Sequence, residues 1–224
     1  MTHDELADEI QARGVTEVLH FTTHKGLVGT LDTGALLSRA DLLSEGRLES
    51  IRLLNCKRRS DEPWIDFINL SISNVNKWMF DTSERWHQQD DVWWAVLAFE
   101  PEILTHDGVL FTTTNNIYPA TRRAEGAEGF RAIFADEVRG RYEERWRRDE
   151  NYASANPTDP QAEVLYPNRL SLDYLKAVYV PEQHRLDDVA GIVRALPPRN
   201  PITVEFNPGI FLPMTASTPS PSRY

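Results

Sequence analysis

The chain has 224 residues, 41% of them hydrophobic, and its 34 acidic residues outnumber its 24 basic residues to give a formal net charge of −10. This length supports a hydrophobic core in one domain, or at most in two small ones. The acidic balance argues against broad, nonspecific nucleic-acid binding, which depends on neutralising many phosphates, and allows only a local basic groove.

Cysteine and histidine are too sparse for a disulfide or a zinc framework. Cys56 is the single cysteine, and among six scattered histidines only His20 and His24 have a spacing that suits chelation from one helical face. No HExxH pattern or carboxylate partner accompanies them, so no metal is expected. The chain has no run of eighteen apolar residues, and Met1 to Arg13 lacks the features of a signal peptide. A cytoplasmic protein that does not span a membrane is expected.

The first predicted elements are a helix over residues 4–13, a strand over 15–21 and a second helix over 25–33. Gly14 is expected to end the first helix, and Gly34 the second. Thr22 or Thr23 can cap the second helix through its hydroxyl. The segment is therefore a strand–helix unit with His20 near its junction.

The central segment predicts strands first and then helices. Residues 66–73 (DFINLSIS) alternate apolar and polar side chains, residues 92–99 do so in part, and residues 109–112 predict a further short strand. Trp93 and Trp94 should pack on opposite faces. Residues 101–104 resemble one helical turn. From 124 to 151 the richness in Glu, Arg and Ala, with apolar residues at helical spacing, predicts one or two helices.

The C-terminal third predicts a polar loop over 151–160, an extended segment over 161–166, a strand over 176–180, a helix over 181–196 and a strand over 202–206. A single domain is expected over residues 1–212, followed by a disordered Pro/Ser/Thr-rich tail over 213–224. Strands interrupted by helices without regular alternation favour an α+β fold. No GxGxxG or GxxxxGK[ST] motif occurs, so neither type of nucleotide site is indicated.

Three groups of polar residues are candidates for chemistry. Gln161 and Glu163 begin a strand, where side chains two residues apart point to one face, so both can enter one cleft. His20 near a strand end could hydrogen-bond a ribose hydroxyl. Asn69, Ser71 and Ser73 form a polar ladder that needs partners or a ligand if it faces inward. Each has a structural alternative, since Gln161 and Glu163 could face solvent on an edge strand and His20 could be a structural histidine.

The order of these motifs resembles the DarT family of DNA ADP-ribosyltransferases. The resemblance covers residues 18–180, with its strongest matches at His20-Phe21-Thr22 and at Gln161-Ala162-Glu163-Val164-Leu165. It implies an α+β, ADP-ribosyltransferase-like fold with a central split mixed or antiparallel β-sheet flanked by helices. It also implies NAD as the donor of ADP-ribose.

The resemblance implies roles for individual residues. Glu163 would be catalytic, because cleaving the nicotinamide–ribose bond creates positive charge on the ribose that a carboxylate can stabilise. Arg59, or else Arg58, would be the active-site arginine that contacts the NAD phosphates. The other expected NAD-binding residues are His20, Phe21, Thr22, Ser71, Ser73 and Phe80, with Phe21 or Phe80 stacking on the nicotinamide.

The acceptor implied by the resemblance is a guanine or thymine base in single-stranded DNA. Gln161 would read the edge of that base, the loop over 151–160 would recognise the strand, and Tyr152 would stack on it. Relatives that modify thymidine have an aromatic-rich strand where this chain has Asn69 to Ser73, so the sequence leaves the base open. The family context also implies a toxin with a cognate antitoxin. The alternatives are an ADP-ribosyltransferase that acts on RNA or protein, and a non-enzymatic interaction module.

Overall fold

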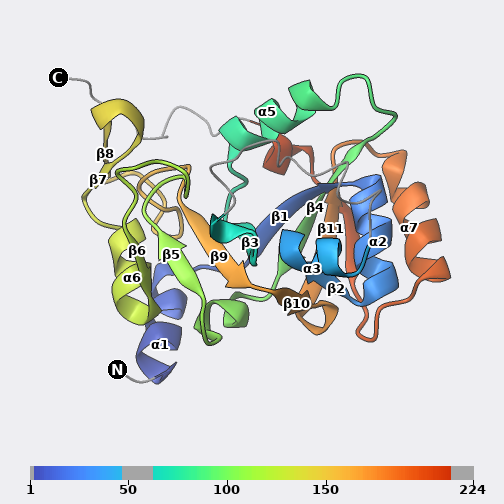
Figure 1. The fold of residues 1–224 in the computed structure, drawn as a ribbon, viewed down its shortest axis with the longest axis horizontal. Coiled ribbons are helices and arrows are strands. Elements are labelled where there is room, and N and C mark those ends of the chain that lie inside the picture. The colour runs from blue at the N-terminus through green and yellow to red at the C-terminus, as the bar shows by residue number, and fades with distance from the viewer. Residues whose placement is uncertain (1–2, 47–62, 213–224) are drawn as a thin grey trace.

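A mixed sheet of eight strands forms the centre of the computed structural model, which describes residues 3–46 and 63–212 (Figure 1). The strand order is β12-β11-β4-β1-β3-β9-β5-β6, in which the β11–β12 pair is parallel and the others are antiparallel. The strands are β1 (Val18–Thr23), β3 (Phe67–Ile72), β4 (Trp94–Phe99), β5 (Leu110–Thr112), β6 (Arg123–Glu125), β9 (Glu163–Pro167), β11 (Leu175–Val180) and β12 (Thr203–Phe206). The predicted α+β class is confirmed.

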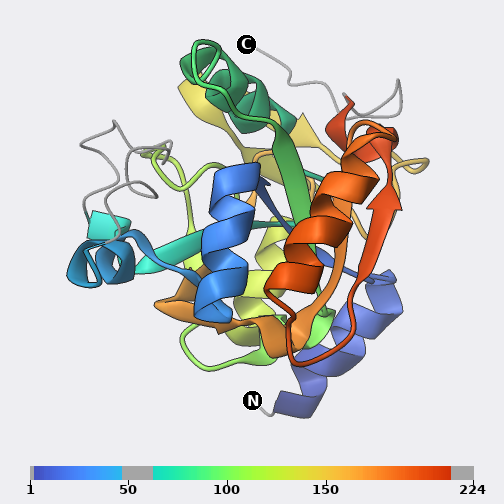
Figure 2. The same cartoon turned by 90° about the vertical axis from the view of Figure 1, so that its right-hand side faces the viewer.

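Four of the helices cover the sheet as two pairs. The helices are α1 (His3–Arg13), α2 (His24–Thr33), α3 (Arg39–Ser44), α5 (Lys77–Trp86), α6 (Gly126–Ile133) and α7 (Arg185–Ala195). Helices α2 and α7 lie side by side, as Figure 2 shows, whereas α1 packs against α6 beneath β5 and β6. Short 3-10 turns are η2 (Pro101–Thr105), η3 (Arg141–Glu143), η4 (Leu172–Tyr174) and η5 (Pro208–Phe211). Within the described ranges, no helix has the length and hydropathy that a bilayer-spanning segment needs.

The first strand–helix unit follows its sequence prediction closely. The Thr23 hydroxyl accepts a hydrogen bond from the Gly26 N–H at the start of α2, and Gly34 ends the helix with a left-handed φ of 67°. A side chain at Gly26 would come within 2.1 Å of the Thr22 hydroxyl oxygen. Glycine at this position therefore lets α2 begin directly against β1.

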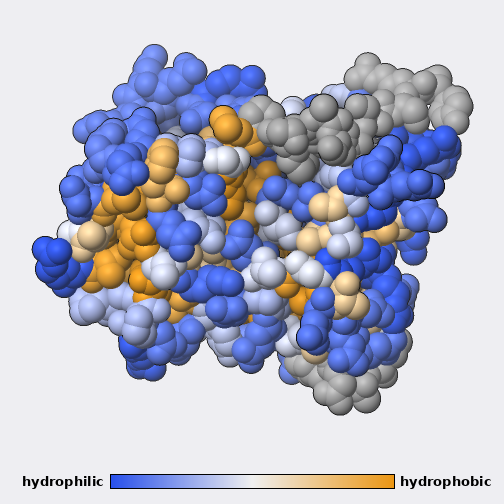
Figure 3. All heavy atoms as spheres, turned by 180° about the vertical axis from the view of Figure 1, so that it is seen from behind, coloured by the Kyte–Doolittle hydropathy of each residue, from blue (hydrophilic) through white to orange (hydrophobic). Residues whose placement is uncertain are grey.

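Two apolar cores lie on the opposite faces of the sheet. Along β4, Ala95, Leu97 and Phe99 belong to the larger core, whereas Trp94, Val96 and Ala98 belong to the smaller one. This alternation is the period of two that a strand imposes, and it places Trp93 and Trp94 in different cores as predicted. In Figure 3, which views the molecule from behind, apolar side chains gather toward the α7 side.

The central sheet splits between β1 and β3. Strand β1 pairs with β4 along six residues but with β3 at only two, Val18 with Ile72 and Leu19 with Ser71. Beyond Leu19 and Ser71 the two strands separate, while β3 continues its pairing with β9. The sheet is therefore open on the side where His20 and Asn69 lie, which agrees with the split sheet that the resemblance implies.

The prediction of helices over 124–151 is wrong in its second half. Helix α6 ends at Ile133, and the chain then forms a hairpin of β7 (Glu137–Arg139) and β8 (Arg145–Arg147). Val138 pairs with Trp146 on the buried side, and Glu137 forms salt bridges with Arg145 and Arg147 outside. The arginines and glutamates thus alternate with period two, and cross-strand charge pairs replace the expected pairs along a helix.

Candidate active site

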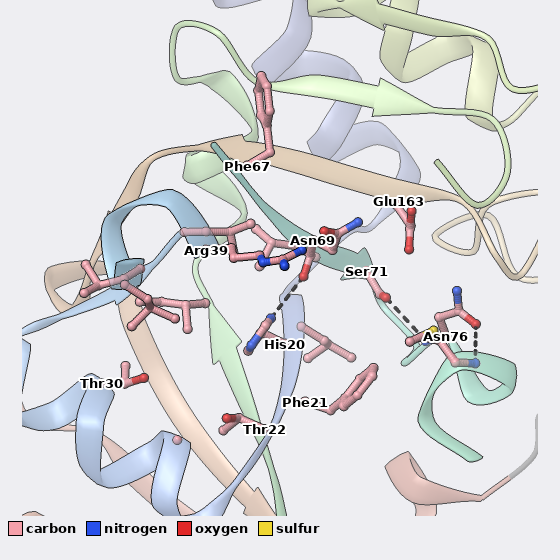
Figure 4. A pocket seen from close by; sticks show the side chains of 18 of the residues that line it. His20, Phe21, Thr22, Thr30, Arg39, Phe67, Asn69, Ser71, Asn76 and Glu163 are labelled. Carbon is pink, nitrogen blue, oxygen red and sulfur yellow. Dashed lines mark hydrogen bonds between the residues drawn. The ribbon is translucent and has the colours of Figure 1, made fainter. Parts of the chain in front are cut away.

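A pocket occupies the opening between β1 and β3. Its walls come from β1, one face of α2, the start of α3, β3, the start of α5 and the loop after β5 (Figure 4). The α2 face contributes Gly26, Gly29, Thr30 and Thr33, and the absence of a side chain at the glycines leaves the space open. Strand β2 (Ala35–Leu37) leads the chain from α2 to α3. It pairs with β10 (Arg169–Ser171), which follows β9, in a separate two-stranded sheet.

His20 bridges the split in the sheet. Its Nδ1 lies 3.0 Å from the Asn69 carbonyl oxygen, where a regular strand pair would have a backbone hydrogen bond. Because a carbonyl only accepts, Nδ1 carries the proton, and Nε2 of the neutral ring is an acceptor. Burial lowers the pKa of the His20 imidazole below its ordinary value, against the opposing hydrogen bond with Asn69. The ring is therefore neutral near pH 7 and can accept a hydrogen bond from a ligand hydroxyl.

Glu163 begins β9 and is 7% exposed in the wall of the pocket. The Asn115 side-chain amide donates to one carboxylate oxygen at 3.1 Å, and the Asn116 backbone N–H donates to the other at 2.8 Å. The Thr112 hydroxyl donates to the Glu163 carbonyl oxygen at 3.1 Å. Two donors thus fix the orientation of a buried carboxylate, as preorganised electrostatic catalysis requires.

Arg123 supports the loop that holds Glu163. Its Nε donates to the Asn116 side-chain oxygen at 2.6 Å, and Nη2 donates to the Asn116 carbonyl oxygen. The guanidinium carbon lies 4.7 Å from the ring centroid of Trp64. Burial lowers the pKa of Arg123, while the negative charge of Glu163 acts in the opposite direction. Arg123 therefore places a positive charge behind the catalytic candidate and fixes Asn116.

Arg39 extends into the pocket from the first position of α3. In Figure 4 its side chain reaches toward Asn69 and His20. Its Nε and Nη1 atoms are buried and have no hydrogen-bond partner among the described residues. A guanidinium at a helix N-terminus also opposes the helix dipole. A buried guanidinium without hydrogen bonds destabilises the folded protein unless an anion accepts from it. Its planar arrangement of N–H donors suits a phosphate or a carboxylate.

The pocket brings together most of the residues predicted to bind NAD. His20, Phe21, Thr22, Ser71 and Glu163 all line it. Their convergence rules out the alternative in which Glu163 faces solvent on an edge strand, because β9 lies between β3 and β5. Arg58 and Arg59 lie outside the described residues, so their roles remain predictions.

Two predicted NAD-binding residues lie behind the pocket wall and do not line it. Phe80 is 3% exposed and packs edge-on against Phe21, Trp94 and Phe211 in the smaller core, so it supports Phe21 and cannot stack on a ligand. Ser73 follows the end of β3 with a left-handed φ of 60°, and its hydroxyl donates to the Ala155 carbonyl oxygen at 3.0 Å. The polar ladder thus ends at Ser71, whose hydroxyl oxygen accepts from the Asn76 N–H at 3.3 Å.

Contacts with Arg148 hold the loop over 151–160 in place. Tyr152 is 7% exposed and lies beneath the guanidinium of Arg148. The prediction that its ring stacks on a base is therefore wrong. Arg148 also donates to the carbonyl oxygens of Asn156 and Ala153, at 2.7 and 2.8 Å. Gln161, at the end of this loop, accepts a hydrogen bond from the Tyr118 hydroxyl at 3.0 Å. Its side chain is therefore held beside Tyr118 at the Glu163 end of the pocket.

Asp159 is a fully buried carboxyl group in the turn before Glu163. One oxygen accepts from the Gln161 N–H at 2.8 Å, and this bond and the Thr114 hydroxyl both favour the ionised form. Burial raises the pKa of Asp159 to about 6 from 3.8. Because the folded state holds this proton more tightly than the unfolded state, its contribution to stability falls as pH rises from about 4 to about 6.

Replacing Asp159 by asparagine is expected to stabilise the protein above pH 7. The amide keeps an acceptor for the Gln161 N–H but cannot ionise, so the free energy of unfolding should rise by about 3 kcal/mol relative to the unmodified chain at pH 7.5. At pH 4 the difference should nearly vanish. Urea unfolding at both pH values measures it, with exposed Asp8→Asn as the control. A constant difference across this range would contradict the ionisation argument.

Four residues that hold or complete the site were not predicted, namely Arg39, Asn115, Asn116 and Arg123. Arg39 follows the Ala35-Leu36-Leu37 strand and the helix-capping Ser38, and its position at a helix N-terminus is the available indication. Asn115 and Asn116 end a run of five buried polar residues that begins at Thr112, the last residue of β5. Among the described residues, no cluster of three or more His, Cys, Asp or Glu side chains could hold a metal ion.

Solved structures share this fold at low sequence identity. Thermus sp. 2.9 DarT in complex with NAD+ is 17% identical, with a TM-score of 0.55 over 88% of this chain and 98% of that one. Thermus sp. 2.9 DarT in complex with ADP-ribosylated ssDNA is 15% identical, with a TM-score of 0.57 over 89% and 97%. Thermosipho africanus DarTG in complex with ADP-ribose is 18% identical, with a TM-score of 0.55 over 88% of this chain. The present chain spans about half of that protein, 51% of its length.

No curated protein matches the chain. A sequence family does match over residues 19–212, which include the whole pocket from His20 to Glu163, and its description is "ssDNA thymidine ADP-ribosyltransferase, DarT". The family resemblance inferred from the sequence is thereby confirmed, and the chain belongs to the DarT family of ssDNA thymidine ADP-ribosyltransferases.

Proposed function

We propose that this protein transfers ADP-ribose from NAD to the base of a thymidine in single-stranded DNA. The observation that carries the proposal is a buried carboxylate, Glu163, held by two donors in the same pocket as a neutral His20. The family description names this reaction. Thermus relatives that share the fold were solved with NAD+ and with ADP-ribosylated ssDNA, which supports both the donor and the acceptor.

The pocket offers one group for each charge that the reaction involves. Departure of nicotinamide leaves positive charge on the ribose, and the fixed carboxylate of Glu163 would stabilise it. His20 would accept a hydrogen bond from a ribose hydroxyl through Nε2. Arg39, whose two buried nitrogens have no partner among the described residues, would bind the diphosphate of NAD. Phe21, backed by Phe80, would contact the nicotinamide ring.

The sequence left guanine and thymine open as targets, and the family description favours thymidine. A single strand suits such an acceptor, because an unpaired base reaches the pocket without the cost of flipping it from a duplex. We also propose that the protein is the toxin of a toxin–antitoxin system with a cognate antitoxin. The DarTG name of the Thermosipho relative supports this role.

Incubation of the protein with NAD and mixed-sequence single-stranded oligonucleotides tests the proposal. The expected product carries one ADP-ribose on a thymidine, located by mass spectrometry of the fragments. Matched oligonucleotides without thymidine should remain unmodified. Modification of guanine alone would correct the base, and modification of RNA or protein but not DNA would replace the acceptor. If NAD binds but no acceptor is modified, the proposed activity is wrong.

A further inference from the structure

Three aromatic rings surround Arg141 at the edge of the pocket. The guanidinium carbon lies 5.6 Å from the ring centroid of Trp78, 5.5 Å from that of Tyr118 and 4.3 Å from that of Tyr142. Trp78 comes from α5, Tyr118 from the loop after β5, and Arg141 and Tyr142 from the turn between β7 and β8. These four residues, which we term the Arg141 cluster, therefore join three segments that are distant in sequence.

The outer rings of the Arg141 cluster are exposed. Trp78 is 41% exposed and Tyr142 is 75% exposed, whereas Tyr118 is buried beneath Arg141. Tyr142 also has a left-handed backbone, with φ 53° and ψ 42°, which is unfavourable for a bulky residue. Because the Tyr142 ring is exposed, its packing contributes little free energy to offset the strain in its backbone. Strained residues of this kind gather at functional sites. The arrangement therefore indicates a surface that contacts a ligand.

The Arg141 cluster adjoins the Glu163 end of the pocket. Asn76, which caps the start of α5, and Met79, which follows Trp78 on that helix, both line the pocket, and so does Ile117 next to Tyr118. The Tyr118 hydroxyl donates to Gln161, two residues before Glu163. An acceptor strand whose reacting base enters the pocket at Glu163 would have to place a neighbouring nucleotide near this cluster.

We propose that the Arg141 cluster binds the nucleotide next to the modified base, with its base stacked on Trp78 or Tyr142 and its phosphate paired with Arg141. Aromatic rings and a guanidinium together are the usual means of holding a single strand, because every base has a π-face. The net charge of −10 makes a local site of this kind more suitable than a broad basic surface. This assignment rests on the proposed acceptor, and its test measures DNA binding apart from transfer.

The first experiment measures the affinity of the full chain for a fluorescein-labelled single-stranded 12-mer by anisotropy. Trp78→Ala combined with Tyr142→Ala is expected to weaken binding at least about tenfold, whereas Tyr142→Phe should retain it. Trp86→Ala is the matched control, because Trp86 is also exposed but lies at the far end of α5. NAD affinity and melting temperature verify that each variant is folded.

A second variant separates binding from folding. Tyr142→Gly removes the ring and relieves the left-handed backbone, so the melting temperature should rise while affinity for the oligonucleotide falls. Arg141→Gln should lower the salt dependence of binding by about 0.7 in the slope of log K against log salt, which is the effect of one phosphate contact. If the Arg141 cluster were purely structural, Tyr142→Gly would lower the melting temperature, and Arg141→Gln would leave the salt dependence of oligonucleotide binding unchanged.

An oligonucleotide with one abasic site at each position in turn locates the stacked base. In the unmodified protein, one position beside the target thymidine should weaken binding, and Trp78→Ala with Tyr142→Ala should abolish that difference. Unchanged affinity in the double variant overturns the assignment of the Arg141 cluster and leaves the proposed reaction intact. Conversely, if the unmodified protein binds NAD and the oligonucleotide through this cluster but transfers nothing, the proposed reaction fails and the cluster assignment stands.

Discussion

Replacing Glu163 by glutamine is expected to lower the rate of ADP-ribose transfer at least about 10²–10³-fold, because removing one preorganised electrostatic group from an active site has effects of this size. The side chain is 7% exposed and both of its oxygens accept hydrogen bonds, so its negative charge lies in a poorly solvated environment. Glutamine keeps the shape and one acceptor but removes the charge that would face the ribose.

The rate should be measured under saturating NAD and oligonucleotide, by mass spectrometry of the product. NAD affinity should change much less than the rate, because the charge on the ribose develops only as the bond to nicotinamide breaks. Glu128→Gln, on the exposed face of α6, is the control. If expression of the protein arrests growth, Glu163→Gln should relieve the arrest. Transfer within threefold of the unmodified rate would show that another group stabilises the ribose.

Local apolar patterns predicted the strands that carry His20 and Glu163. Glu163 begins β9, whereas His20 is the third of six residues in β1, because that strand continues to Thr23 beyond its predicted end at Phe21. The split of the sheet then brings them to one pocket. Periodicity alone could not establish that convergence, because it depends on pairing between segments more than forty residues apart, as with His20 and Asn69.

The residues that were missed owe their positions to loops and turns. Asn116 reaches Glu163 because Arg123 holds its side chain and carbonyl, a contact that no local pattern indicates. Phe80 and Tyr152 were aromatic and near candidate motifs, but tertiary packing buries both rings. The β7–β8 hairpin misled the helix prediction because alternating charges suit both structures. Its turn nevertheless presents Tyr142 beside Arg141.

Replacing Arg39 by methionine is expected to weaken NAD binding about 10- to 100-fold, which corresponds to a charge-assisted hydrogen-bonding group at a phosphate. The same change should leave the melting temperature of the ligand-free protein unchanged or higher, because it removes two buried nitrogens that have no partner among the described residues. The substitution would thus lower the affinity for NAD without lowering the melting temperature. That combination is expected of a residue whose role is to bind a ligand.

Calorimetric titration with NAD measures the effect, and Arg194→Met on the exposed face of α7 is the matched control. Arg39→Lys should restore only part of the affinity, since an ammonium group cannot donate the paired hydrogen bonds of a guanidinium. Arg59→Met provides the decisive comparison with the sequence prediction. If NAD affinity falls in Arg59→Met but not in Arg39→Met, Arg59 is the phosphate-binding arginine, and the buried guanidinium of Arg39 needs another explanation. A loss confined to Arg39→Met assigns the diphosphate to the part of the pocket wall that α3 contributes, beside Asn69 and His20.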